Sequence, residues 1–183
     1  MSNKKQKNNS TLYNEMEAKY LDNTSITNYA LEDKDMVNSL ELIRNILLNE
    51  HCKDKNILFT NQLGLNLDKV EILKTKKSSI HNSTVDFVVG LAKGQLLLVE
   101  AKFDAKNMEK IASEIYRKVD HSKELLISNT SFVGCYKKKI ILLSNDKFEQ
   151  NKRRLLNLLD NDISFYPLNV EQFYLFFFKP NNH

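Results

Sequence analysis

Two acids and one lysine interrupt the apolar runs of residues 84–103, TVDFVVGLAKGQLLLVEAKF. They are Asp86, Glu100 and Lys102, and the residues around them are typical of strands buried on both faces. Burying an acid without a partner is costly, because the carboxylate loses its hydration. These three residues therefore need an offsetting charge, such as a metal ion.

The turn between the two expected strands decides whether the three side chains meet. Side chains alternate across a strand, so Glu100 and Lys102 project from the same face, about 6.7 Å apart along the strand. A three-residue loop at 92–94 would place Asp86 opposite Glu100, whereas a two-residue turn would put Asp86 on the other face. Gly94 falls where a three-residue hairpin loop favours a left-handed glycine. The turn chemistry therefore predicts two carboxylates and an ammonium on one patch.

Such a patch suits phosphodiester hydrolysis. Two carboxylates a few ångströms apart repel each other unless a cation lies between them. Oxygen-only ligands favour the hard ions Mg²⁺ or Mn²⁺, which keep waters and substrate phosphate oxygens as further ligands. Lys102 would then orient or activate the attacking water and stabilise charge on the phosphate, while the ion activates that water and clamps the scissile group.

The flanking patterns predict the elements that position this hairpin. Apolar residues recur at helical spacing over residues 33–50, which predicts an amphipathic helix with an acidic start. Residues 57–65 fit a short strand or an irregular connection, and residues 69–76 alternate like a strand that is solvated on one side. After the hairpin, the spacing predicts a helix over 108–126 capped by Asp104, a strand at 139–143, a helix at 147–159, a strand at 163–168 and a helix at 170–178.

This order predicts an α/β fold, a mixed central β-sheet flanked by helices on both sides. A chain of 183 residues suits a single domain, expected over 11–183, and the basic, polar residues 1–10 have the composition of a disordered tail. The two cysteines show no metal or disulfide spacing, which favours a reduced, intracellular setting. No apolar run is long enough to cross a bilayer, so we expect a soluble protein without a membrane partner.

The spacing of Asp86 and then Glu100-Ala101-Lys102, on paired strands between two helices, resembles the PD-(D/E)xK nuclease superfamily. The resemblance covers roughly residues 33–143 as a layout and implies a restriction-endonuclease-like fold. In that superfamily the Asp and Glu bind Mg²⁺ and the Lys serves in catalysis, which implies these roles for Asp86, Glu100 and Lys102. Val85 stands where the motif name has proline.

Many members of the superfamily add an acid from the first core helix, and the expected helix at 33–50 offers two. Glu41 borders the apolar stripe and Glu50 continues it at the far end. Glu41 is favoured as the third metal ligand because it lies in mid-helix, and Glu50 is the alternative.

The leading hypothesis is an Mg²⁺- or Mn²⁺-dependent nuclease, with DNA favoured over RNA on the basis of the fold alone. A net charge of +4 permits a nucleic-acid partner, and basic groups at 74–77, 137–139 and 152–154 could contact phosphates. Cutting both strands of a duplex commonly needs two sites, which a homodimer would supply. The alternative is a catalytically silent nuclease-like domain that binds nucleic acid or a protein partner in a larger assembly, its charged cluster being only a buried salt bridge.

Overall fold

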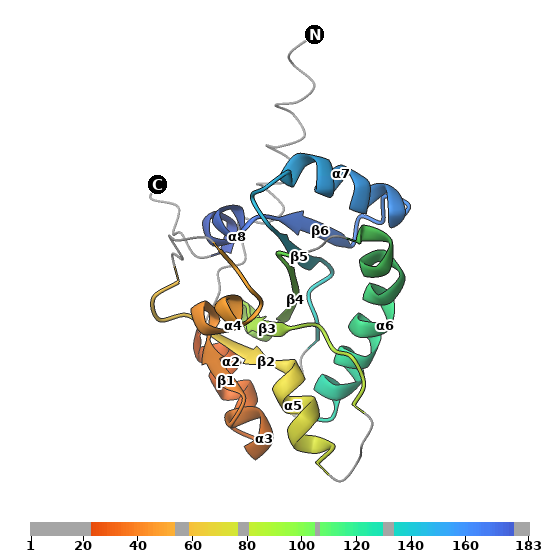
Figure 1. Cartoon of the computed structure of the whole chain (residues 1–183). Helices are drawn as coiled ribbons and strands as arrows, with labels where there is room; N and C mark the ends of the chain where they lie inside the picture. Colours follow the sequence, from red (N-terminus) through yellow and green to blue (C-terminus); the bar gives the residue numbers. More distant parts are fainter. Residues whose placement is uncertain (1–22, 54–58, 77–80, 105–106, 130–133, 178–183) are drawn as a thin grey trace.

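A mixed sheet of six strands runs through the protein in the computed structural model (Figure 1). The structure describes residues 23–53, 59–76, 81–104, 107–129 and 134–177, so the expected tail at 1–10 lies outside the described residues. The strands follow one another across the sheet in sequence order: β1 (Leu40–Leu42), β2 (Leu63–Asn66), β3 (Phe87–Gly90), β4 (Leu96–Lys102), β5 (Lys139–Leu143) and β6 (Phe165–Leu168). Strands β1 to β4 pair antiparallel, and β4, β5 and β6 pair parallel.

Helices cover both faces of this sheet, as the sequence predicts. The described residues form seven: α2 (Asn23–Ala30), α3 (Lys34–Val37), α4 (Ile43–Asn49), α5 (Leu67–Lys74), α6 (Met108–Ile127), α7 (Phe148–Leu158) and α8 (Val170–Phe177). Ile115 of α6 and Leu155 of α7 are buried with Leu98 of β4 in a first core. Ile46 of α4 and Phe173 of α8 are buried in a second core on the opposite face of the sheet.

The hairpin of β3 and β4 has the predicted register. Phe87 pairs with Val99 and Val88 with Leu98, and continuing this register places Asp86 opposite Glu100. Residues Ala92–Gly94 form a single turn of 3-10 helix between the strands, and Gly94 has a φ of 78°. A side chain is strained in this left-handed region, so glycine permits the turn that brings the two acids to one face.

The predicted helix over 33–50 is wrong, because its apolar residues serve opposite faces of the sheet. Asp33 caps the short helix α3, and its Oδ1 accepts hydrogen bonds from the backbone N–H groups of Asp35 and Met36. Met36 lies in the first core, whereas Ile43 of α4 lies in the second. Strand β1 carries the chain from one face to the other, and the helical spacing of the apolar residues hides this crossing.

Two further local predictions are wrong. Residues 69–76 are not a strand, because Asn66 accepts the N–H of Lys69 as a helix cap and α5 begins there. The cap of α6 is Asn107, whose Oδ1 accepts the N–H of Lys110, and not Asp104.

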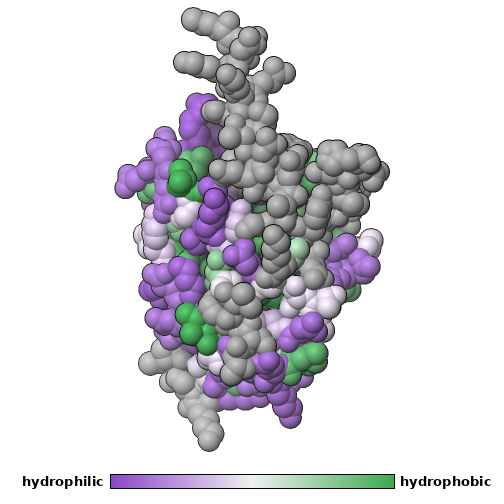
Figure 2. All heavy atoms as spheres, turned by 180° about the vertical axis from the view of Figure 1, so that it is seen from behind, coloured by the Kyte–Doolittle hydropathy of each residue, from purple (hydrophilic) through white to green (hydrophobic). Residues whose placement is uncertain are grey.

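The second half of the chain follows the predicted order of strand, helix, strand and helix. Pro167 lies in β6 at the end of the sheet, where its missing N–H costs no ladder hydrogen bond. Among the described residues, no helix is both long enough and apolar enough to span a membrane. Figure 2 shows the back of the molecule, where hydrophobic side chains form separate spots among hydrophilic ones.

Candidate functional site

Asp86, Glu100 and Lys102 meet at the first-core face of the sheet. Lys102 Nζ lies 2.7 Å from Glu100 Oε1 and 3.7 Å from Asp86 Oδ2, so both acids contact one ammonium. The backbone N–H of Ala101 donates to Asp86 Oδ2 at 2.5 Å, which fixes this carboxylate against β4. Asp86 is 5% exposed and Glu100 1%. The register therefore brings together the two carboxylates and the ammonium that the sequence predicts on one patch.

A second lysine reaches the same acids from α6. Lys118 Nζ lies 2.7 Å from Glu100 Oε1 and 3.9 Å from Asp86 Oδ1. The helix is tied to the segment that leads into β3, because Ser122 Oγ accepts the N–H of Val85 and donates to the carbonyl of Lys118. One oxygen of Glu100 thus accepts from two ammonium groups.

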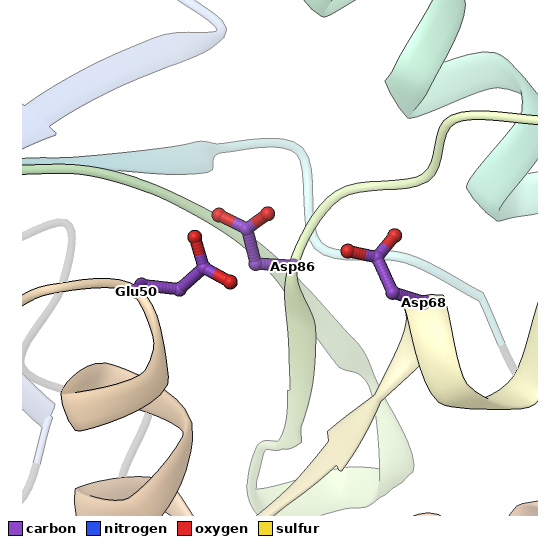
Figure 3. Close-up of side chains that lie close together, drawn as sticks. All are labelled: Glu50, Asp68 and Asp86. Atoms are coloured by element: carbon purple, nitrogen blue, oxygen red, sulfur yellow. The ribbon is translucent and has the colours of Figure 1, made fainter.

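Three carboxylates from three separate segments lie close together, with Asp86 between Glu50 and Asp68 (Figure 3). Glu50, Asp68 and Asp86 each offer an oxygen, and these oxygens lie within 4.8 Å of one another. Glu50 follows the last residue of α4, and Asp68 lies in the first turn of α5. The start of α5 is anchored to the site, because the N–H of Leu67 donates to the carbonyl of Asp86 and Thr84 Oγ1 donates to Asp68 Oδ1.

Glu41 is not part of this group. It lies in strand β1, where its Oε1 is 2.9 Å from Lys69 Nζ. The choice of Glu41 over Glu50 depended on the helix at 33–50, and the break of that helix removes its basis. Of these two candidates, Glu50 is the one that approaches Asp86.

Burial and nearby negative charges raise the pKa values of Asp86 and Glu50. Burial, reinforced by the nearby charge of Glu100, raises the pKa of Asp86 to about 8. Burial also raises the pKa of Glu50, and Asp68 and Glu100 add to this rise although Lys102 opposes it. A divalent cation between these groups would favour their charged forms and displace the proton of Asp86.

Lys102 is held in its ammonium form. Burial opposes this, but the charges of Asp86 and Glu100 outweigh burial and raise the pKa of Lys102 above its ordinary value. An ammonium cannot accept a proton, so Lys102 can orient a water or stabilise negative charge but cannot act as a general base.

Glu100 keeps one buried oxygen without a partner. Its Oε1 accepts from both lysines, whereas its Oε2 is buried and has no hydrogen-bond partner among the described residues. Leaving a buried carboxylate oxygen unsatisfied is costly in a purely structural salt bridge. This oxygen is therefore free to bind a cation or a metal-bound water.

The chain has no match among protein-family models, curated proteins or solved structures. The chemistry of the site must be argued from its own geometry.

Two residues at the site, Asp68 and Lys118, were not singled out by the sequence pattern, and a third, Glu50, was only the alternative. Asp68 directly precedes the segment 69–76 that was predicted as a strand, and only the prediction of a helix starting there would have marked it. Glu50 was only the second choice, because a continuous helix put it at the far end. Lys118 lies three residues after Ile115 and four before Ser122, and this position at the border of the apolar stripe of α6 is the signal that could have found it.

Lys118→Met is expected to increase the affinity for Mn²⁺ roughly three- to tenfold, because it removes an ammonium that competes for Glu100 and Asp86. Isothermal titration with Mn²⁺ measures this change. Lys110→Met removes an exposed lysine from the same helix and is the matched control. A weaker affinity in Lys118→Met would instead mean that Lys118 holds Glu100 in position for the ion.

Proposed function

We propose that this protein is a metal-dependent nuclease that hydrolyses phosphodiester bonds, with DNA as the favoured substrate and a restriction-endonuclease-like core. The observation that carries the proposal is the convergence of Asp86, Glu100 and Lys102 at the predicted register, with the carboxylates of Glu50 and Asp68 beside Asp86. The order of strands β2, β3 and β4, then helix α6 and parallel strand β5, supports the fold part of the proposal.

The donor set fits a hard divalent cation. Glu50, Asp68 and Asp86 supply only carboxylate oxygens, and Glu100 adds a buried oxygen that has no protein partner among the described residues. Such ligands favour Mg²⁺ or Mn²⁺ over softer metals. We assign Asp86 and Glu100 as the central ligands. Glu50 and Asp68 would either coordinate the ion directly or accept hydrogen bonds from its water ligands.

A divalent ion bound there supplies a nucleophilic water at neutral pH and a counter-charge for the scissile phosphate. The residues of the chain would do the remaining work. The Lys102 ammonium, 2.7 Å from Glu100, can donate a hydrogen bond to the attacking water or to a phosphate oxygen. Lys118 adds a second fixed positive charge on the side of α6. Because Lys102 is protonated, the proton of the water must leave to an unprotonated carboxylate or to solvent.

A catalytically silent domain is the competing function, in which the two lysines only neutralise Glu100. Two features favour the nuclease. A structural cluster needs no unsatisfied buried oxygen on Glu100, and it gains nothing from the mutual repulsion of Glu50, Asp68 and Asp86. Cleavage of DNA by the purified protein in Mg²⁺, abolished by a chelator, tests the proposal.

Glu50→Gln is expected to weaken Mn²⁺ binding roughly tenfold or more, because it removes a carboxylate from the metal site. Glu41→Gln makes the same chemical change in β1, where the carboxylate contacts Lys69, and should leave the affinity unchanged. Isothermal titration of the two variants compares them directly. Equal losses in both variants would contradict the assignment of Glu50.

A further inference from the structure

A polar cleft of about 570 Å³ opens beside the candidate metal centre. Its volume lies in the range of sites that hold small ligands. Two elements form it, the segment that leads into β3 and the outer side of α6, and its lining residues are Asn82, Ser83, Arg117, Asp120, His121 and Glu124. None of these residues has a role in the proposed hydrolysis.

A buried carboxylate behind this cleft contacts two of its lining residues, Asn82 and His121. Glu71 of α5 is 3% exposed, and its two oxygens accept from the backbone N–H of Asn82 at 2.9 Å and lie 3.0 Å from His121 Nε2. Burial opposes ionisation, but these hydrogen bonds and the nearby histidine hold the pKa of Glu71 below its ordinary value. The pair fixes both walls of the cleft, because it ties α6 to the segment before β3.

The cleft lies close to the candidate metal centre along α5 and α6. Asp68 and Glu71 are three residues apart on α5, and Lys118 and His121 are three residues apart on α6. Residues at this spacing are neighbours on a helix surface. The Glu71–His121 contact therefore lies one helical turn away from the residues that approach Asp86. A ligand in the cleft would lie next to the phosphate bound at the metal centre.

We propose that this cleft binds one nucleotide of the nucleic-acid strand adjacent to the scissile phosphate, an inference that rests on the proposed nuclease function. The exposed guanidinium of Arg117, the residue next to Lys118, pairs with the flanking phosphate. The exposed carboxylates of Asp120 and Glu124 accept hydrogen bonds from the base. Asp120 lies 3.4 Å from Lys123 Nζ and Glu124 lies 3.6 Å from His121 Nδ1, and contacts of such exposed carboxylates are weak enough to be replaced.

Asp120 and Glu124 make the cleft better suited to the base of a nucleotide than to the phosphate backbone. Carboxylates repel a bare phosphate backbone, but they accept hydrogen bonds from the exocyclic amino groups of bases. Cytosine and adenine carry such a group on their pairing edge, and thymine does not. The cleft should therefore bind a cytosine-containing strand more tightly than a thymine-containing one.

Fluorescence anisotropy with labelled oligo(dC) and oligo(dT) of equal length, in Ca²⁺ so that binding is measured without Mg²⁺-dependent cleavage, tests the inference. The wild type should bind oligo(dC) about three- to tenfold more tightly. Arg117→Ala should weaken both complexes about tenfold and reduce the slope of log affinity against log salt by about 0.7, the value for one single-strand phosphate contact. The double variant Asp120→Ala, Glu124→Ala, which removes both hydrogen-bond acceptors, should lose the preference for oligo(dC).

Arg44→Ala removes one exposed arginine from α4, outside the cleft and outside the basic groups of the chain, and is the matched control for charge. The inference is overturned if Arg117→Ala weakens binding no more than Arg44→Ala does, or if the wild type binds both oligonucleotides equally. Its failure is separable from that of the nuclease proposal. If the wild type cleaves DNA but Arg117→Ala binds oligonucleotides as tightly as the wild type, only the cleft proposal is wrong. If Arg117→Ala weakens binding but the wild type cleaves nothing, only the nuclease proposal is wrong.

Discussion

Asp86→Asn is expected to abolish stabilisation of the protein by Mg²⁺ or Mn²⁺ and, without divalent ions, to raise the melting temperature above that of the wild type. The first effect follows because the Asp86 carboxylate lies close to Glu100 and also belongs to the cluster with Glu50 and Asp68, so it is central to the proposed metal site. An ion at about a hundred times its Kd stabilises the wild type by about 2.7 kcal/mol, which the variant should lose. The second effect follows because the variant removes a buried charge that Glu100 repels.

The second effect should depend on pH. The pKa of Asp86 is raised to about 8 in the folded protein, far above the ordinary value in the unfolded chain. The folded state therefore binds the extra proton, so the contribution of Asp86 to stability is present at low pH and is lost as the pH rises towards 8. The melting temperature of Asp86→Asn should exceed that of the wild type by a few degrees near pH 8, and the two should converge near pH 4.

Scanning calorimetry of both proteins, with and without Mn²⁺ and across this pH range, checks both effects. Asp35→Asn changes the same chemical group in the short helix α3 and is the control. A variant that melts lower than the wild type at pH 8 without metal would show that Asp86 is a stabilising partner of the lysines. Undiminished stabilisation by Mn²⁺ would remove Asp86 from the metal site.

Lys102→Met is expected to slow DNA cleavage by roughly a hundred- to a thousandfold, because it removes the ammonium that contacts both central acids. Methionine keeps much of the volume of the side chain, so the hairpin should fold. Binding of Mn²⁺ should persist, since lysine is not a ligand. Single-turnover cleavage of plasmid DNA measures the rate, and isothermal titration measures the ion.

Lys110→Met is the matched control, because Lys110 is an exposed lysine of α6. This variant should cleave DNA at the wild-type rate. Cleavage by Lys102→Met at the wild-type rate would move the catalytic role to Lys118, the other ammonium within 2.7 Å of Glu100. A loss of both cleavage and Mn²⁺ binding would mean that Lys102 holds the acids in place.

The hairpin that carries the central acids was predictable because its rules are local. Strand alternation decided the faces of Glu100 and Lys102, and the left-handed requirement at Gly94 decided the register of Asp86. The long helix α6 was predictable for the same reason, since a single apolar stripe faces a single core.

The remaining acids were not predictable because tertiary structure places them. The chain from 33 to 50 crosses from one face of the sheet to the other through β1, and no periodic pattern marks the crossing. That crossing decides whether Glu41 or Glu50 approaches Asp86. The position of Asp68 depends on the helix cap at Asn66, because helix α5 begins there although the following residues alternate as in a strand. Whether the core is restriction-endonuclease-like and whether the cluster is catalytic both stay predictions.

Cleavage by the purified wild type is the measurement that tests the central claim most directly. Plasmid, linear duplex and single-stranded DNA, with RNA beside them, are incubated with Mg²⁺ or Mn²⁺ and, in parallel, with a chelator. We predict metal-dependent cleavage of at least one DNA substrate, no cleavage with the chelator, and none by Asp86→Asn. A wild type that binds Mn²⁺ yet cuts none of these substrates, or cleavage that Asp86→Asn retains, would contradict the account.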